Sequence, residues 1–256
     1  MDRVKLILLG YIALGLVLLV YSYGFVDPGL LTAIPAWLRS AHEPLRVLVF
    51  ETRPHAGMVY IVLVTLLYAL YLTLLRTPRL KSISRYIRWG VVLVGICIVS
   101  YPAFSHDIFN YMLTAKITFL YRENPYIVAP TSIPSESMLA FTRAANKTAL
   151  YGPVWILLTW IPHVLASGNT WMSILLFKVL VGVFYIVVSR YIYIVTRSWR
   201  NVVFFVLHPL VLVETLVSGH NDIMMMGLVL QHYPCVQRVA CVTAWLGSHS
   251  SSHPYS

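Results

Sequence analysis

Acidic residues are scarce in this sequence, and so are charges of any kind. Only nine of the 256 residues are Asp or Glu, and charged residues make up 11% of the chain, against 59% hydrophobic ones. A soluble domain with so few charges could not cover its surface with polar groups. The composition therefore excludes a soluble globular protein and predicts an integral membrane protein.

Cysteine patterns and the usual motifs of soluble enzymes are also lacking. The three cysteines, Cys97, Cys235 and Cys241, have neither the spacing of a disulfide framework nor that of a metal site. The chain has no glycine-rich phosphate loop, no Ser/His/Asp order and no HExxH. These absences give no sign of soluble-enzyme chemistry.

The many cations of the chain lie in short loops between apolar segments. Lys and Arg number 19, and the formal net charge is +10. Cations spread in this way indicate basic loops on one side of a bilayer, and we expect no nucleic-acid partner. The loop 76–88 carries cations and no acid, which predicts that it is cytoplasmic. Together with Arg3 and Lys5, it places the N-terminus inside and the loops 22–56 and 105–148 outside.

Five apolar stretches predict membrane-spanning helices. A secretory signal peptide is the alternative for the first of them, but the many later spans favour a retained helix. The residues between the first two carry mixed charges and several prolines, which predicts a loop with a short interfacial piece. The stretches are 6–21, 57–75, 89–104, 172–196 and 201–219, and the mixed loop is 27–55.

Residues 149–167 form a further apolar stretch, which contains two prolines. A second basic cluster, at Arg190, Arg197 and Arg200, should again be cytoplasmic. If 149–167 crossed the membrane fully, five crossings from an inside N-terminus would precede this cluster and put it outside. One consistent solution is a proline-broken hairpin over 149–167 that enters and leaves the membrane on the outer side.

The longest polar interruption of the apolar sequence is 105–126. If a helix begins at about Asp107, then Asp107, Asn110 and Thr114 share one face, and apolar residues share another. Such a helix lies on a membrane surface with its polar side up. The predicted fold is therefore all-α, a polytopic transmembrane helical bundle with interfacial amphipathic helices in a large extracytoplasmic loop.

The character of the chain changes after Leu230. The apolar run 223–230 is too short for a bilayer that needs about 20 residues. Residues 231–256 show no helical periodicity and end in a Ser/His/Pro cluster. We expect a transmembrane domain over 1–230 and an atypical tail over 231–256, either disordered or produced by a frameshift or premature stop.

Polar groups near the expected outer surface have both a structural and a functional interpretation. Asp107 could be an acid at a helix start behind a Ser105 cap, or a general base that takes a proton from an acceptor hydroxyl. The run His220, Asn221 and Asp222 could begin the next helix, or could hydrogen-bond the hydroxyls of a sugar.

Other polar residues also have two interpretations. On the structural interpretation, the tripeptide Tyr-Gly-Pro at 151–153 is only a turn into an apolar segment, with proline in its first turn. Arg122 is either a solvated loop charge or a phosphate ligand, which its planar donors suit. Lys178 and Glu214 lie inside apolar stretches, where charge is costly, and could pair with each other. Lys178 could instead extend to an interface.

Four motifs follow one another along the chain. They are SHDIFNY at 105–111, ENPY at 123–126, YGP at 151–153 and LHPLVLVETLVSGHND at 207–222. In this order they resemble the multi-spanning GT-C glycosyltransferases, and among them the polyprenol-phosphate-mannose-dependent mannosyltransferases. The resemblance covers roughly 88–230. The family has a glycine before NPY where this chain has Arg-Glu, and its members continue through several more spans.

The resemblance implies an enzyme that transfers a hexose, mannose in the closest group, from a polyprenyl-phosphate sugar to a glycan or glycolipid acceptor. It implies a protein of the cell membrane, among membrane lipids, with its site facing outside the cytoplasm and Asp107 as the base. Because the sugar already carries a phosphate leaving group, no metal or other cofactor is implied. The implied substrate-binding residues are Asn110, Tyr111, Arg122, Asn124, Tyr126, Tyr151, His220, Asn221 and Asp222.

Two other functions are compatible with the sequence. One is a non-catalytic membrane protein, a carrier or an accessory subunit, in which Lys178, Glu214 and the prolines within spans line a translocation path. The lack of an internal repeat and the gathering of polar groups at one interface count against it. The other is a truncated transferase without activity.

Overall fold

The computed structural model describes residues 3–31, 36–51, 53–77 and 83–232. These residues form helices and connecting loops without any strand, which confirms the all-α prediction. Three helices are long and apolar enough to cross a membrane, and they match expected spans: α1 (Arg3–Tyr23), α4 (Arg53–Leu75) and α9 (Thr170–Thr196). A bent pair, α10 (Trp199–Val206) and the π-helix η5 (Val211–Val217), is a fourth candidate.

The shorter helices connect and cover these spans. In chain order they are α2 (Pro28–Leu31), α3 (Ala36–Arg46), the π-helix η1 (Val47–Glu51), α5 (Ile83–Val99), α6 (Asp107–Ala115), the π-helix η2 (Lys116–Leu120), the 3-10 helices η3 (Pro130–Ser132) and η4 (Ser137–Phe141), α7 (Pro153–Leu158) and α8 (Trp160–Ala166).

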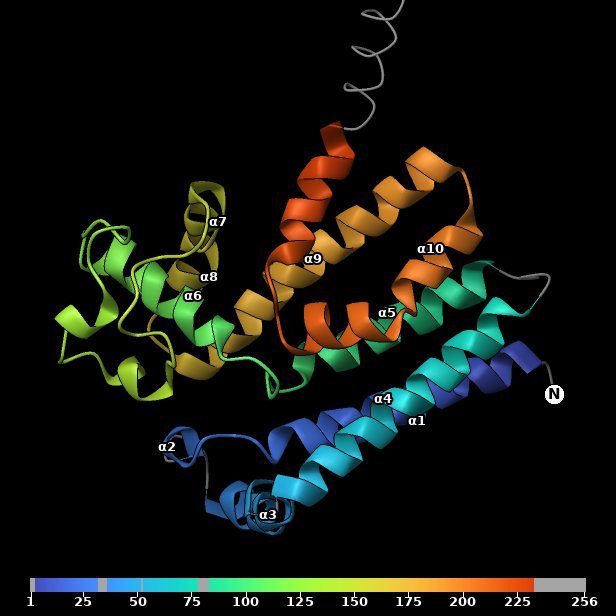
Figure 1. Ribbon diagram of the computed structural model, residues 1–256, viewed down its shortest axis with the longest axis horizontal. Helices are drawn as coiled ribbons and strands as arrows, with labels where there is room; N and C mark the ends of the chain where they lie inside the picture. Colours follow the sequence, from blue (N-terminus) through green and yellow to red (C-terminus); the bar gives the residue numbers. More distant parts are fainter. Residues whose placement is uncertain (1–2, 32–35, 52, 78–82, 233–256) are drawn as a thin grey trace, which may run out of the picture.

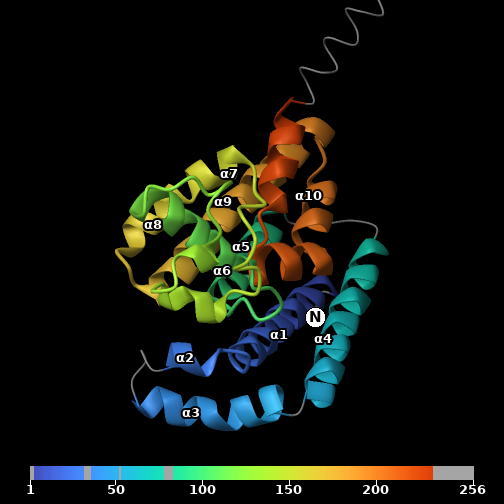
Figure 2. The same ribbon diagram turned by 60° about the vertical axis from the view of Figure 1, so that its left-hand side comes forward.

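The bundle is organised around α1, α5 and α9. Helix α1 packs against α4 and α5, and α9 packs against α5, α8, α10 and η5. Helices α6, α7 and α8 gather at the end of the molecule far from the N-terminus (Figure 1). The turned view shows α2 and α3 leading along one side of the molecule from α1 to α4 (Figure 2).

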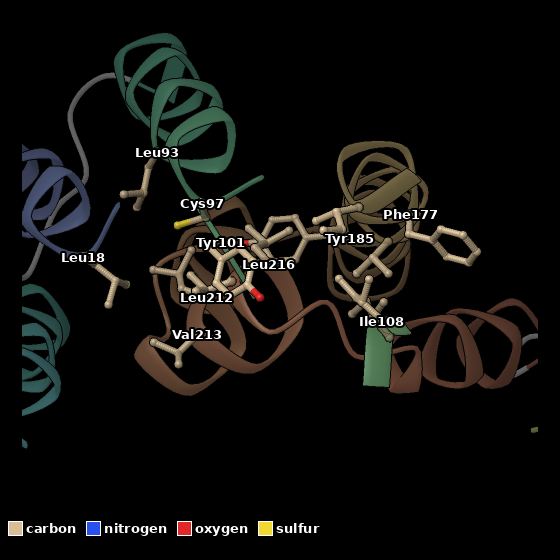
Figure 3. Packing of buried hydrophobic residues seen from close by; sticks show 14 of the residues in the cluster. Leu18, Leu93, Cys97, Tyr101, Ile108, Phe177, Tyr185, Leu212, Val213 and Leu216 are labelled. Carbon is tan, nitrogen blue, oxygen red and sulfur yellow. The ribbon is translucent and has the colours of Figure 1, made fainter. Parts of the chain in front are cut away.

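Buried side chains from α1, α5, α9 and η5 form one core, part of which Figure 3 shows. Inside a bilayer, helices associate by close packing rather than by the hydrophobic effect. At Gly15, a methyl group would lie 2.9 Å from Leu93 Cδ1. The absence of a side chain at this position therefore lets α1 approach α5 closely.

Lys178 is buried in this core and is 1% exposed. Its Nζ donates hydrogen bonds to the carbonyl of Cys97, at 2.8 Å, and to the carbonyl of Ser100. These carbonyls belong to the last turn of α5 and the residue that follows it, where no helix partner is available. The suggested pairing of Lys178 with Glu214 and its suggested extension to an interface are therefore both wrong, because the ammonium serves the end of α5.

The expected span 201–219 is broken rather than straight. Helices α10 and η5 meet at an angle of 64°. Pro209 lies at the break, where it has no N–H to donate to the helix. The two carbonyls just before the break accept hydrogen bonds from Tyr185, at 2.6 Å, and from Tyr11, at 2.8 Å. Side chains of α9 and α1 thus satisfy carbonyls of Val206 and Leu207 that face the break.

Three other expectations about segments need correction. The mixed loop 27–55 is largely helical, since α2, α3 and η1 lie within it. The expected span 89–104 ends at Val99, and its apolar part is shorter than a full span. The reversal expected inside 149–167 lies at its end, because α7 and α8 continue almost directly and the chain turns at Ser167 and Gly168, which both have positive φ.

The basic segments meet at one end of the bundle. Arg200 Nη2 donates a hydrogen bond to the carbonyl of Leu75 at 3.0 Å, so the start of α10 lies beside the end of α4. Lys5 and Arg88 line one shared pocket, so the starts of α1 and α5 are also neighbours. The expectation that the two basic clusters share one side agrees with this arrangement. Figure 1 shows this end on the side of the N-terminus, opposite α6.

Helix α6 is not a surface helix with a polar upper side. Thr114, expected on the polar face, is buried, and so are the apolar residues around it. Helices α7, α8 and α9 and the 3-10 helix η4 pack against α6. Only Asp107 and Asn110 of the expected polar face are partly exposed.

The apolar run that begins at Ile223 is helical, and the helix extends over 222–232. Of the expected tail 231–256, only the first two residues belong to the described part, and they continue this helix. The prediction of an atypical tail otherwise lies outside the described residues.

Candidate active site

Asp107 is the first residue of α6, at the end of the bundle opposite the basic loops. Ser105 Oγ accepts a hydrogen bond from the Asp107 N–H at 3.1 Å, but the N-cap residue is His106, whose side chain makes no capping bond. The expected cap by Ser105 is therefore only partly correct. The carboxylate itself is not used to cap the helix. Its Oδ1 accepts a hydrogen bond from Asn110 Nδ2 at 3.4 Å, and 42% of the side chain is exposed. The carboxylate is therefore oriented and still open to a substrate.

His220 lies between two carboxylates. Its Nε2 is 3.5 Å from Asp107 Oδ2, and its Nδ1 is 3.1 Å from Glu214 Oε2. A protonated imidazole can donate to both carboxylates, whereas a neutral one can donate to only one. The three side chains form an acid–imidazole–acid chain, with Asp107 at its end. We call these residues, together with Asn110, Tyr111 and Asn221, the Asp107 cluster.

The backbone after η5 brings Glu214 and His220 together. The His220 N–H donates to the carbonyl of Glu214 at 3.2 Å, which closes a wide turn. Gly219 within this turn has φ 78°, a conformation that suits glycine. A methyl group here would lie 2.5 Å from Ile108 Cδ1. Gly219 thus lets the turn pack directly on α6, and π-helical turns such as η5 often occur at functional sites.

Tyr111 is the most deeply buried of the six residues in the Asp107 cluster and is 1% exposed. Its hydroxyl donates to Asn221 Oδ1 at 3.2 Å and accepts from the Asn221 N–H at 3.3 Å. The ring meets Tyr151 and Trp155 edge to face, with centroids 4.7 and 5.0 Å apart. Burial raises the pKa of Tyr111, and nearby Tyr151 and Asp107 add to this shift. The hydroxyl of Tyr111 therefore stays neutral, and it positions Asn221 through these two hydrogen bonds.

Tyr151 lies on the other side of Asn110. Burial raises the pKa of Tyr151, as does the charge of Asp107, while a hydrogen bond from the Asn110 side chain opposes the shift. The amide of Asn110 therefore links Asp107 to Tyr151. Asp107 and Asn110, which lie on one turn of α6, are thus brought together with Tyr151 from a distant part of the sequence.

The NPY turn lies next to the cluster rather than inside it. Asn124 Oδ1 accepts from the Tyr126 N–H at 3.0 Å, and the Tyr126 hydroxyl donates to the carbonyl of Tyr151 at 2.8 Å. These bonds fasten the loop to the segment that opens α7. Among the described residues, no hydrogen bond or ion pair joins Arg122, which has φ 58°, or Asp222 to the Asp107 cluster.

A partly buried ion pair holds the same loop against α6. Lys116 Nζ lies 2.7 Å from Glu136 Oε1, and the other oxygen of Glu136 accepts from the Tyr121 hydroxyl at 3.1 Å. Burial alone would raise the pKa of Glu136, but the bonds from Lys116, the Met138 N–H and Tyr121 lower it overall. Lys116 thus has a structural role, because it pairs with Glu136.

A cavity of about 480 Å³ lies beside His106, the neighbour of Asp107. Its polar lining includes Asp27 after α1, Arg143 after η4 and His106 itself, while aromatic residues form much of the remaining wall. Burial and then the charge of Arg143 lower the pKa of His106, and Asp27 and Asp107 act in the opposite direction. His106 therefore lies between the Asp107 cluster and the cavity.

Sequence reasoning missed several of these groups. The sequence marks Glu214 only as a charge within an expected span. No motif near Gly219 indicates that the turn there joins Glu214 to His220. Asp27 is one of the mixed charges of the loop 27–55, and no motif distinguishes it from them, although it follows the first apolar run at the same end as Asp107. Arg143 has no motif around it that could have identified it.

The described residues contain no group of three His, Cys, Asp or Glu side chains placed to hold a metal ion. The prediction that no cofactor takes part is not tested by this geometry and stays a prediction. What the residues do provide is an exposed carboxylate with an imidazole and an amide against it. This arrangement can accept a proton and can hydrogen-bond hydroxyl groups.

The fold and the cluster together define a membrane protein with an acid–base site at one end of an apolar helical bundle. A family model described as alpha-(1->6)-mannopyranosyltransferase, N-terminal domain, matches residues 7–250. The chain belongs to this family of GT-C type mannosyltransferases, which confirms the predicted resemblance and the predicted transferase activity. A sugar donor and an acceptor are its substrates. No curated protein and no solved structure matches the chain.

The matched segment passes residue 230 without a break. The division of the chain at this residue into a transmembrane domain and a tail stays a prediction.

Proposed function

We propose that this mannosyltransferase uses a polyprenyl-phosphate mannose as its donor and a glycan or glycolipid as its acceptor, with Asp107 as the general base. The observation that carries the proposal is the Asp107 carboxylate, which is held by Asn110 and His220 and remains 42% exposed. The site lies at one end of apolar helices, where a donor anchored by a lipid tail presents its head group. A water-soluble donor would need no such location.

The orientation follows from the basic end. Lys5, Arg88 and Arg200 share the end opposite the Asp107 cluster, and basic loops are retained in the cytoplasm. This supports a multi-pass protein of the cell membrane whose Asp107 cluster faces outside the cytoplasm. A lipid-linked donor suits that side, where nucleotide sugars are not available to the site.

The chemistry needs few groups. Asp107 takes the proton of the acceptor hydroxyl as the oxygen attacks the anomeric carbon, and the bond from that carbon to the phosphate oxygen breaks. The transition state is oxocarbenium-like, and charge develops on the departing phosphate. Because phosphate is already a good leaving group, we also propose that no metal or other cofactor takes part.

The predicted substrate residues divide by their surroundings. Asn110 and His220 are partly exposed beside Asp107, and Asp222 is exposed nearby, so they suit direct hydrogen bonds to sugar hydroxyls. Tyr111 and Asn221 bond each other, which suits a positioning role. The remaining predicted residues lie along the loop and its junction with α7: Arg122, Asn124, Tyr126 and Tyr151.

The proposal is tested by offering two donors to membranes that contain the protein. Polyprenyl-phosphate mannose with a radiolabel in the sugar should be consumed and its label transferred, in vesicles whose outer face is accessible. Nucleotide-linked mannose should give transfer only when the lipid-linked donor can first be made from it. Direct transfer from the nucleotide sugar would contradict the proposed donor.

The same assay separates the transferase from a carrier. Lys178, which favoured a translocation path, is occupied by backbone carbonyls of α5 and of the residue after it, so Lys178 no longer supports that function. Binding of the lipid-linked sugar without turnover, accompanied by movement of a solute across the vesicle membrane, would nevertheless favour a carrier over the transferase.

A further inference from the structure

An apolar groove of about 440 Å³ opens on the outer surface of the bundle between α1, η1 and α4. Val17 and Val20 of α1 and Val59 of α4 line it, and their side chains are 42–58% exposed. Both helices are candidate spans. The groove therefore faces the lipid chains of the bilayer near the end of the bundle that carries the Asp107 cluster.

The groove is continuous with the polar cavity beside His106. Val49 of η1 and Ala56 of α4 line both of them. A molecule can therefore occupy both at once, with an apolar part between α1 and α4 and a polar part near α6. The combined site is amphipathic along its length, apolar at the membrane and charged inside.

The charge inside the cavity comes from Arg143 and Asp27. Within the described part of the chain, Arg143 has no ion-pair or hydrogen-bond partner and its side chain is exposed. Asp27 Oδ1 is already held by the Gly29 N–H at 2.8 Å. An arginine with all its donors available suits a phosphate, which accepts two parallel N–H bonds from a guanidinium.

We propose that this groove and cavity form the binding site for the isoprenoid phosphate part of the donor, with the first isoprene units between α1 and α4 and the phosphate at Arg143. The assignment rests on the proposed function, since it takes a polyprenyl-phosphate sugar as the donor. It selects Arg143 rather than Arg122 as the phosphate ligand. His106 then lies between the phosphate and Asp107, so the sugar extends from the cavity towards the base.

Two features favour a polyprenyl-phosphate sugar over a purely apolar chain and over a free inorganic ion. The groove ends at a cavity that contains a cation without a partner, so an apolar chain alone would leave Arg143 unused. Tyr101, Phe104, Phe109 and Phe141 form part of the cavity wall, which suits the sugar next to the phosphate more than a free inorganic ion.

The test uses a polyprenyl phosphate without sugar that carries a photoreactive diazirine on an isoprene unit near the phosphate. The purified protein in lipid nanodiscs is irradiated and the labelled peptides are mapped. Label is expected on α1 around 16–20, on 48–49 and on 55–59. The matching polyprenol, which lacks the phosphate, should label these segments about tenfold less, since a charged hydrogen-bonded contact is lost.

Matched variants separate the groove from its surroundings. Val59→Trp should fill the groove and Arg143→Ala should remove the phosphate ligand, each lowering the label about tenfold. Ile61→Trp changes an exposed position on another face of α4, and Lys147→Ala removes another cation of the same loop. Both should stay within about twofold of the original. Val20→Trp replaces Val59→Trp if the latter unfolds in a thermal melt.

Equal labelling by the phosphate and the alcohol, or an equal loss in Ile61→Trp and Val59→Trp, would overturn the site. Labelling needs no turnover, so this result is independent of activity. If the label maps as expected while the protein transfers no mannose from the lipid-linked donor, the proposed function fails and the site stands. If transfer occurs and the label maps elsewhere, the site fails alone.

Discussion

The two ends of the helical bundle hold their charges in opposite ways. At the basic end, Arg200 is exposed and is held by one hydrogen bond to a backbone carbonyl and by the face of Phe204, 5.1 Å from its ring centroid. At the other end, His220 contacts the carboxylates of both Asp107 and Glu214, and Gly219, with positive φ, lies in the turn that joins His220 to Glu214. Loosely held cations suffice to set the orientation of a helix, whereas catalysis requires groups at fixed positions.

The difference predicts how each end responds to mutation. Substitutions at the Asp107 end should change activity through small displacements, because several side chains share one hydrogen-bonded arrangement. Substitutions at the basic end should change activity little as long as the net charge of the loops persists. The following predictions test this contrast, from the largest expected effect to the smallest.

Gly219→Ala should have the largest effect on the geometry of the site. The new methyl group would meet Ile108 and the residue would keep an unfavourable positive φ, at a cost of about 1–3 kcal/mol. Movement of His220 by about 1 Å is enough to lower transfer about 100-fold. Transfer rate and thermal stability are measured together on the purified variant.

Gly95→Ala is the matched control, because a methyl group there has no atom within 4 Å and α5 has ordinary helical geometry. It should be neutral or slightly stabilising, by up to about 1 kcal/mol. Equal damage from both alanines would mean that the turn at Gly219 has no special role.

Tyr111→Phe should lower transfer about tenfold and cost about 1 kcal/mol of stability, because Asn221 loses its buried hydroxyl partner. Tyr193→Phe at the basic end keeps its ring contact with Trp199 and should change neither quantity measurably. Kinetics of both variants with the lipid-linked donor provide the comparison, and an unaffected Tyr111→Phe enzyme would remove Tyr111 from the support of the site.

The Lys116–Glu136 pair should make the loop near α6 sensitive to acid. The folded protein holds the pKa of Glu136 below its ordinary value of 4.5, so the pair stabilises the fold above that pH. This contribution is lost as the pH falls below 4.5 and through the lowered pKa of Glu136. Glu136→Gln should flatten this part of the profile of melting temperature against pH, and an unchanged acid slope would argue against the pair.

Arg200→Ala should have the smallest effect. The side chain is held by one partly exposed hydrogen bond and one ring contact, together worth about 1 kcal/mol or less. Transfer should remain within about twofold of the original enzyme. A loss comparable to that of Tyr111→Phe would show that the basic end contributes to catalysis and would weaken the contrast.

The sequence predicts the long helices well because their signal is local. Apolar runs of sufficient length identify α1, α4 and α9, and the cations at their ends place the loops. The same reasoning fails at Pro209, where α10 and η5 bend by 64°, because the bend depends on partners in distant helices. Tyr11 and Tyr185 supply these partners, and neither carries a recognisable motif.

The site is predicted only in part for the same reason. Asp107, Asn110 and His220 stand in polar runs that resemble family motifs, and the structure brings them together. Glu214 joins them only through the turn after η5, which no sequence period indicates. Helix α6 was expected on the surface because Asp107, Asn110 and Thr114 share one face of it. Thr114 is buried, so the exposed polar face ends at Asn110.

The most direct test of the central claim is the rate of mannose transfer by Asp107→Asn, measured beside Asp222→Asn at equal protein accumulation in the membrane. If Asp107 is the base, its replacement should lower transfer by about 100-fold or more while the protein still accumulates and binds the donor. Asp222→Asn removes a neighbouring acid that is not joined to His220 and should lose much less. Full activity of Asp107→Asn would contradict the assignment of the base.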